Sequence, residues 1–291
     1  MAKAMDVAYK ENLYIIESFA PLIKALKLMG ERGGIYRLSV VDDQKRAKGV
    51  ISSLRILEYI AGHKGKILKK KAGGLEALLQ EPVLLFMEEY LHKLPYSFAF
   101  ECIVQYMVEN KVGHVILVDE KDCIKGVITE RPAIERIPPR HYGINLSAIM
   151  TRKVHTIKPE SSIFEALNLM AAHHVRRLPL LSEGEVVGVL SASDLFRYLV
   201  KTEGPEEALK EKENLENRLS EEVVTLSLPK PVLIGEHEDV GELLKRVQER
   251  WIPYHPVVSE EGKLAGVVSE RDLITRFSRV LGMERFLKLI A

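Results

Sequence analysis

An internal repeat is the feature that most constrains how this chain of 291 residues can fold. The segment Gly188–Leu195 (GVLSASDL) resembles Gly266–Leu273 (GVVSERDL), and weaker relatives lie upstream at Gly126–Ala133 (GVITERPA) and Gly49–Ile56 (GVISSLRI). Each copy contains a glycine, a short apolar stretch, a hydroxyl residue and the start of an amphipathic helix. Such repetition indicates that every copy forms the same supersecondary unit.

The similarity extends backwards from each glycine. In the third copy, Ile163–Met170 has helical apolar spacing, Val175–Leu181 is strand-like and Ser182–Gly184 is a turn. The corresponding strands of the other copies are 35–41, 112–118 and 252–258. Each unit is therefore predicted to have the order strand, helix, strand, turn, strand, helix, which makes the fold class α/β.

A unit this small cannot bury both faces of a three-stranded sheet by itself, so we expect neighbouring units to pair. The four repeats are predicted at about 11–62, 78–136, 145–200 and 219–280. We place the boundary between the two pairs at Arg140, after Pro138-Pro139, which gives modules 1–140 and 141–291. The charged segment 201–222 is expected to be partly helical. No stretch remains for a separate catalytic domain.

Composition argues against several classes of protein. Lys and Arg number 42 against 41 Asp and Glu, whereas proteins that mainly bind nucleic acid more often carry a basic excess. The chain shows no membrane-spanning apolar run and no secretory signal at its N-terminus. Two cysteines are too few for a disulfide framework or a zinc site, and Cys102 is predicted to be a buried thiol. We expect a cytosolic protein without a metal.

A hydroxyl residue followed three positions later by aspartate opens a helix in the last two repeats. Ser191 and Asp194 form this pattern in the third repeat, and Ser269 and Asp272 form it in the fourth. One carboxylate can accept a hydrogen bond from each of the two adjacent ribose hydroxyls, and such charge-assisted bonds are strong. The helix N-terminus beside it suits a phosphate. The pattern therefore predicts a nucleotide site.

The same pattern is close to a capping box, and taken locally it favours a cap that only satisfies free N–H groups. The first two repeats have Arg55 and Pro132 at the aspartate position, so the helix is predicted to form without a carboxylate. We therefore assign Asp194 and Asp272 to a ligand. Arginine cannot accept a hydrogen bond and proline has no polar side chain. The first two clefts are expected to be empty or to bind in another geometry.

These features resemble cystathionine-β-synthase (CBS) domains, which pair into Bateman modules. The resemblance covers nearly the whole chain, and it is closest in the third and fourth repeats, weaker in the second and weakest in the first. A chain of four repeats without an attached enzyme is similar to archaeal stand-alone CBS proteins that are homologous to the gamma subunit of AMP-activated protein kinase. The resemblance implies a flat, pseudo-symmetric disk with a central channel and nucleotides in clefts between paired repeats. In the family, the aspartate holds the ribose.

Basic residues of the family face the phosphates and the central channel. Aligning Pro179 with Pro256 puts Arg177 opposite Tyr254, and without gaps Arg37 and His114 take the same position. The predicted phosphate contacts are Arg37, His114, Arg131, Arg177, His255 and Arg271. For each of them, pairing with a nearby surface acid is the alternative. The adenine is predicted to lie against the apolar residues Val154, Thr156, Pro179, Pro231, Leu233 and Pro256.

No nucleophile elbow, Walker motif or metal-ligand spacing appears in the sequence, so no catalytic residue is predicted. The favoured hypothesis is a non-catalytic sensor of the energy state that binds AMP, ADP or ATP and acts on an unknown protein partner. Two alternatives remain open. One is a sensor of S-adenosylmethionine or another adenosyl compound, and the other is a scaffold or RNA-binding protein with vestigial clefts that uses its lysine-rich linker. A homodimer is expected.

Overall fold

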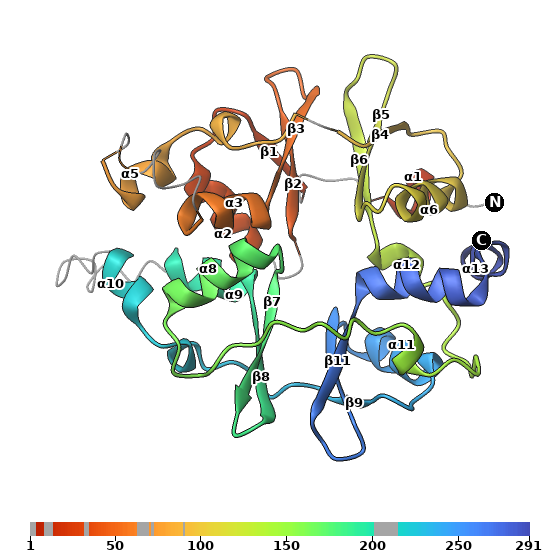
Figure 1. The fold of residues 1–291 in the computed structure, drawn as a ribbon. Helices are drawn as coiled ribbons and strands as arrows, with labels where there is room; N and C mark the ends of the chain where they lie inside the picture. The colour runs from red at the N-terminus through yellow and green to blue at the C-terminus, as the bar shows by residue number, and fades with distance from the viewer. Residues whose placement is uncertain are drawn as a thin grey trace.

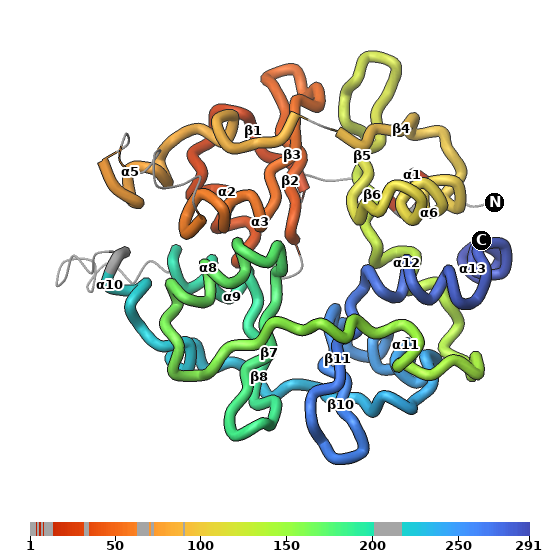
Figure 2. Tube along the Cα trace, in the orientation of Figure 1, coloured from red at the N-terminus to blue at the C-terminus, as the bar shows by residue number. Residues whose placement is uncertain are grey.

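The computed structural model describes residues 4–8, 14–31, 35–62, 70, 73–89, 91–200 and 215–291. It contains four similar α/β units arranged around a common centre (Figure 1). The first and second units lie in the upper half of this view, and the third and fourth lie in the lower half. Figure 2 follows the backbone through the four units. The lysine-rich residues 63–69 and the charged residues 201–214 lie outside the described residues.

The order of elements within the units follows the predicted one. The first unit comprises β1 (Ile15–Glu17), α2 (Leu22–Glu31), β2 (Arg37–Val41), β3 (Ala47–Ser52) and α3 (Ser53–Ile60). The second comprises β4 (Lys93–Pro95), α6 (Phe100–Glu109), β5 (His114–Val118), β6 (Ile124–Thr129) and α7 (Arg131–Ile134). The third comprises α8 (Ile163–His173), β7 (Arg177–Ser182), β8 (Glu185–Ser191) and α9 (Ala192–Leu199). The fourth comprises β9 (Ile234–Gly235), α11 (Val240–Glu249), β10 (Tyr254–Val258), β11 (Leu264–Ser269) and α12 (Glu270–Leu281).

Additional short elements connect or flank these units. They are α1 (Ala4–Val7), α5 (Leu75–Gln80), the 3-10 helix η2 (Val83–Leu85), η3 (Leu146–Ala148), α10 (Leu215–Ser220), η4 (Val223–Leu226) and the C-terminal α13 (Met283–Ile290). Helix α10 lies in the segment that was expected to be partly helical. Helix α13 buries Phe286 and Ile290 in the apolar core that also contains residues of α6.

Each sheet is built in the same way. The second and third strands form an antiparallel hairpin, and the first strand is parallel to the second. The third unit differs, because its first strand is reduced to a single parallel bridge between Ile157 and Leu180. Pro159, which has no N–H to donate, follows closely and stops further pairing. The predicted strand order is confirmed, with this one strand shorter than expected.

Sheets join sequential units, whereas helices join units that are distant in sequence. Val50 and Ile116, from the sheets of the first and second units, share a small apolar cluster. The segment before the second unit pairs with the sheet of the first unit, where Glu88 bridges Val50. The segment before the third unit pairs with the sheet of the fourth unit, where Thr151 bridges Val267. One large core combines helices of the first and third units, and the other combines helices of the second and fourth. Every unit is thereby buried on two sides.

Helices of the first and third units approach one another closely. At Gly30 of α2, an added Cβ would lie 2.8 Å from the Arg197 backbone nitrogen of α9, so only glycine permits this contact.

Cys102 contradicts the expectation of a buried thiol, because it is exposed. The buried face of α6 is formed by Phe100, Ile103, Val104 and Met107, and Cys102 lies on the other face.

Candidate nucleotide clefts and central cavity

The residue that opens the second strand occupies an equivalent place in every unit. Arg37, His114, Arg177 and Tyr254 each pair across the hairpin with the hydroxyl residue that ends the third strand. These partners are Ser52, Thr129, Ser191 and Ser269. The ungapped alignment made from the sequence therefore describes the backbone register correctly. In each unit a charged or aromatic side chain is next to the start of the following helix.

The hydroxyl residue caps the helix in three of the four units. The Ser52 side chain accepts a hydrogen bond from the Arg55 backbone nitrogen, so the cap forms without an aspartate. In the last two units the aspartate also accepts a hydrogen bond from the capping serine. Ser191 N donates to Asp194 Oδ2, and Ser269 N donates to Asp272 Oδ2, both at 2.9 Å. Capping thus uses Oδ2 of each aspartate. The other oxygen, Oδ1, has different neighbours in Asp194 and in Asp272.

The first cleft lies beside Asp194 and has a volume of about 440 Å³. It brings together four predicted residues, Ser191, Asp194, Arg177 and Pro231. Asp194 Oδ1 accepts one bond, at 3.1 Å, from the half-exposed Arg197. The third unit supplies the carboxylate and the fourth supplies an apolar wall, which also includes Val232 and Trp251. A nucleoside-sized ligand would therefore contact two repeats at once.

The second cleft lies beside Asp272 and has a volume of about 820 Å³. The predicted residues Ser269, Asp272 and Arg271 line it, as do Lys111 and His174. Asp272 is buried, with an exposed fraction of 4%, and its Oδ1 is held at 3.1 Å by both the Thr151 hydroxyl and the Arg276 guanidinium. This carboxylate is more fully engaged than Asp194.

The remaining predicted adenine contacts are not gathered at the Asp272 cleft. Val154 and Leu233 line neither cleft, and Thr156 lines a separate apolar hollow beside Phe164 on the outer side of α8. Pro179 and Pro256 are buried within their strands. Both prolines lie on the face of their strand opposite the core residues Leu178 and Val257, yet they line neither cleft.

His255 lies away from both clefts. Successive strand residues point to opposite faces, so His255 faces the core while Tyr254 borders the Asp194 cleft. Its exposed fraction is 1%, and neither ring nitrogen has a hydrogen-bond partner among the described residues. Burial, followed by the charges of Arg246 and Arg177, lowers the pKa of His255 to about 4. The placement does not support the predicted phosphate contact.

The equivalent positions of the first two repeats are closed. The Arg55 Nε donates to the Phe86 carbonyl at 3.1 Å, and its guanidinium pairs with Glu58 at 3.4 Å. Arg55 also lies over the Tyr59 ring at 5.0 Å. Pro132 is buried at the start of the short helix α7. Neither residue offers a carboxylate to a ribose, as the sequence indicated.

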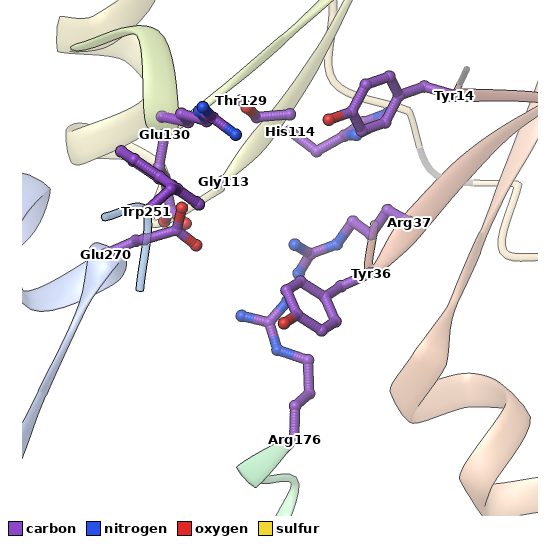
Figure 3. Close-up of a pocket in the computed structure, with 11 residues that line it drawn as sticks. Tyr14, Tyr36, Arg37, Gly113, His114, Thr129, Glu130, Arg176, Trp251 and Glu270 are labelled. Carbon is purple, nitrogen blue, oxygen red and sulfur yellow. The ribbon is translucent and has the colours of Figure 1, made fainter. Parts of the chain in front are cut away.

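A small cavity of about 60 Å³ lies where the four units meet (Figure 3). Three predicted phosphate contacts, Arg37, His114 and Arg131, line it. The sequence analysis missed six further lining residues that carry charge or an aromatic ring: Tyr14, Tyr36, Glu130, Arg176, Trp251 and Glu270. Figure 3 shows Arg37 and Arg176 on one side and Glu130, Trp251 and Glu270 on the other. The segments ITERP and VSERD already placed the two glutamates at matching positions.

Burial dominates the electrostatics of this cavity. It lowers the pKa of Arg37, and it lowers the pKa of Arg176 to about 10, with the charges of Arg37 and Arg177 adding to the effect. Burial also lowers the pKa of His114 to about 3, so its ring, 3.1 Å from the Ser39 hydroxyl, is neutral at physiological pH. Burial and then the Glu130 charge raise the pKa of Glu270 to about 7.

Arg177 and Arg271 connect the cavity to the two clefts. Arg177 Nη2 donates to the Tyr36 hydroxyl at 2.5 Å, and Tyr36 and Trp251 line both the cavity and the Asp194 cleft. Arg271 Nε donates to Glu130 Oε1 at 2.5 Å on the other side. No cluster of metal-ligating side chains occurs among the described residues, and no helix within them is long and apolar enough to cross a membrane.

Comparison with known proteins identifies this architecture. The CBS domain family matches residues 4–62, 146–201 and 222–279, which together make up more than half of the chain. The chain belongs to the CBS domain family. The match includes the first repeat and leaves out the second, so the expectation that the second repeat resembles the family more than the first was wrong. The second repeat nevertheless has the sheet order β4-β5-β6 of a CBS unit.

Similar proteins extend over nearly the full chain. The "Uncharacterized 33.4 kDa protein in ribosomal RNA operon" of Thermofilum pendens is 27% identical, covering 94% of this chain and 91% of its own length. Protein MJ1225 of Methanocaldococcus jannaschii is 24% identical over 95% of this chain and 99% of its length. The crystal structure of MJ1225, described as a proposed archaeal homologue of the AMP-activated kinase γ subunit, superposes with a TM-score of 0.80 at 21% identity, covering 94% of this chain and 99% of that one.

A structure from Pyrococcus horikoshii superposes with a TM-score of 0.53 at 19% identity, covering 86% of this chain and 92% of that one. At these identities the superpositions establish the fold. The four CBS repeats form two Bateman modules in a pseudo-symmetric disk, as the resemblance implied.

Proposed function

We propose that this CBS protein is a non-catalytic regulatory protein that binds an adenine nucleotide, with the Asp194 cleft as its principal site. The observation that carries the proposal is the convergence of Ser191, Asp194 and Arg177 from one repeat with the apolar wall of another. A ribose at Asp194 Oδ1 would displace only the solvent-exposed Arg197 contact. The apolar wall offers Pro231, Val232 and Trp251 to a purine ring, and Arg177 lies toward the centre for the phosphate.

The proposed regulation follows from where the cleft lies. Tyr36 of the first repeat lines the Asp194 cleft together with residues of the third and fourth repeats, so a bound nucleotide would touch both modules. A ligand shifts a conformational equilibrium only by the difference between its affinities for the two states. A nucleotide that bridges the modules can have such a difference, and an interacting protein would respond to the favoured state. We propose a cytoplasmic sensor of this kind that acts as a homodimer.

The boundaries proposed for the modules remain 1–140 and 141–291. The similarity to MJ1225, which is described as a proposed archaeal homologue of the γ subunit of AMP-activated kinase, supports AMP, ADP or ATP as the ligand class. S-adenosylmethionine shares the adenosine part but carries a cationic sulfonium where a nucleotide carries its first phosphate, so it would place a positive charge near Arg177. It is therefore the informative competitor.

Calorimetric titration of AMP, ADP, ATP and S-adenosylmethionine into the full chain tests the proposal. We expect saturable binding of a nucleotide and a loss of about 10- to 100-fold in affinity for Asp194→Ala, because hydrogen bonds to a charged group contribute roughly 1.5–3 kcal/mol. The matched control is Asp43→Ala, which removes an exposed aspartate of the first repeat's hairpin turn. Equal affinity of the Asp194→Ala variant and the wild type would contradict the proposed site.

A further inference from the structure

The two sides of the central cavity carry opposite charges. The first and third repeats contribute the guanidiniums of Arg37 and Arg176, whereas the second and fourth contribute the carboxylates of Glu130 and Glu270, beside Arg131 of the second repeat (Figure 3). A centre that only had to receive phosphates would need the cations alone. The acidic side is therefore unexplained by nucleotide binding as such.

Glu130 and Glu270 differ in how they are neutralised. Glu130 forms an ion pair with Arg271, with 2.5 Å between Glu130 Oε1 and Arg271 Nε. Its carboxylate is further confined by Gly113, where an added Cβ would lie 2.7 Å from the Glu130 side chain. Glu270 forms no ion pair or side-chain hydrogen bond with any described residue. It is thus the one carboxylate lining the cavity that lacks a partner within the part of the chain that the structure describes.

The size of the cavity limits what can reach Glu270. A single water needs roughly 10–15 Å³ of such space, so about 60 Å³ accommodates a few waters, which is comparable to one phosphoryl group. Tyr36 and Trp251 border both this cavity and the Asp194 cleft. The first phosphate of a nucleotide in that cleft would meet Arg177, and additional phosphates would extend toward Glu270.

We propose that Glu270 is a specificity-determining residue that opposes any phosphate chain extending into the centre beyond the first phosphoryl group of a nucleotide in the Asp194 cleft. The site would accordingly select nucleoside monophosphates over triphosphates. This inference rests on the proposed nucleotide function and adds the phosphate number to it. The physical basis is like-charge repulsion in a poorly solvated space, where two unit charges a few ångströms apart interact far more strongly than in water.

The selectivity should depend on pH through Glu270. The charged groups that face it are Glu130 and Arg131 from the second repeat, Arg176 and Arg177 from the third, and Arg37 from the first. The arginines keep their charge between pH 6 and pH 8, and His114 stays neutral because its pKa is about 3. Since the pKa of Glu270 is about 7, protonation below that pH removes the repulsion. Triphosphate affinity should then rise as the pH falls.

Calorimetry on the full chain tests this proposal with AMP and ATP at pH 6 and pH 8. For the wild type at pH 8 we expect AMP to bind at least tenfold more tightly than ATP. Glu270→Gln should narrow that ratio about tenfold, chiefly by strengthening ATP binding, and its ratio should change less between pH 6 and pH 8 than that of the wild type, because only the ligand phosphates still titrate. The matched control Glu260→Gln alters a carboxylate with an exposed fraction of 87% and should retain the wild-type ratio.

The outcomes separate this inference from the proposed function. If AMP binding depends on Asp194 but Glu270→Gln keeps the wild-type ratio at pH 8, the inference is wrong and the nucleotide site stands. If no nucleotide binds, the proposed function fails, and inorganic phosphate and tripolyphosphate replace the nucleotides as probes of the centre. Tripolyphosphate must then bind Glu270→Gln about tenfold more tightly than the wild type, while phosphate changes little. Absence of that gain overturns the inference as well.

Discussion

The clefts at Asp194 and Asp272 occupy equivalent places in successive repeats, yet they offer different carboxylates to a ligand. Both aspartates cap their helices with Oδ2, as the repeated sequence requires. At Asp194 the other oxygen meets only Arg197 at the surface, whereas at Asp272 it is buried between Thr151 and Arg276. Equivalence in sequence therefore fixes the cap, and the neighbouring segment decides whether the aspartate is available for binding.

The largest expected difference concerns stability. Asp272→Ala would remove the cap bond and the buried Oδ1 contacts with the Thr151 hydroxyl and the half-exposed Arg276, and losing hydrogen bonds to a buried charged group costs about 2–3 kcal/mol. Asp194→Ala removes the cap bond and a more exposed contact, which costs about 1 kcal/mol. Urea unfolding of both variants measures the free energies of unfolding. Equal losses for the two variants would show that the clefts are alike.

A second difference lies two residues before the aspartates, where Glu270 corresponds to Ala192 of the third repeat. The pKa of Glu270 is raised from 4.5 to about 7, so ionising this group disfavours the folded state. The cost is absent below pH 4.5, grows as the pH rises and is complete above about pH 7. Glu270→Gln should be more stable than the wild type by up to about 3 kcal/mol at pH 8, converging at pH 4. Thermal unfolding across this range measures it, and a constant difference between pH 4 and pH 8 would contradict it.

A smaller effect should follow from freeing the buried aspartate. Arg276→Gln removes one of the two groups that hold Asp272 Oδ1, so the second cleft should bind AMP about three- to tenfold more tightly, equivalent to roughly 1 kcal/mol. Arg285→Gln, which alters an exposed arginine on α13, is the control. Calorimetry of an Asp194→Ala background isolates the second cleft. Weaker binding to Arg276→Gln would instead identify Arg276 as a ligand contact.

The smallest signal is spectroscopic. The single tryptophan, Trp251, lines the Asp194 cleft, while His174 lines the Asp272 cleft at the corresponding position. Tryptophan fluorescence should therefore change by some tens of per cent when the first cleft fills and should not respond to the second. If the fluorescence followed the filling of both sites seen by calorimetry, the prediction that Trp251 reports only on the Asp194 cleft would be wrong.

Sequence predicted the fold because the same glycine, strand and helix pattern occurs four times, and each copy supports the interpretation of the others. It also named Ser191, Asp194, Arg177 and Pro231 as site residues from their places in the repeated hairpin or its entering strand, and all four line one cleft, although Pro231 was assigned to the adenine contacts of the fourth repeat. The positions of these residues depend on the pairing register of the hairpin, and aligning the four repeats with one another predicts that register.

The misses have a different physical origin. His255 was assigned to a phosphate, but strand alternation turns its side chain into the core. Glu130 and Glu270 were overlooked because their role arises only when the second and fourth repeats meet at the centre. The engagement of Asp272 by Thr151 depends on a segment 121 residues away. Contacts between repeats are invisible to a pattern found within each repeat.

The apolar cores described above cross the module boundary, with the first repeat sharing one core with the third and the second sharing the other with the fourth. Each half of the chain therefore has two apolar helical faces that are covered only by the other half. Cutting the chain near Arg140 would produce two fragments that each need a companion, and the most accessible companion for a fragment would be its own duplicate. The polypeptide is in this sense a dimer whose subunits were joined end to end, and the covalent link allows one half to carry Asp194 and Asp272 where the other carries Arg55 and Pro132.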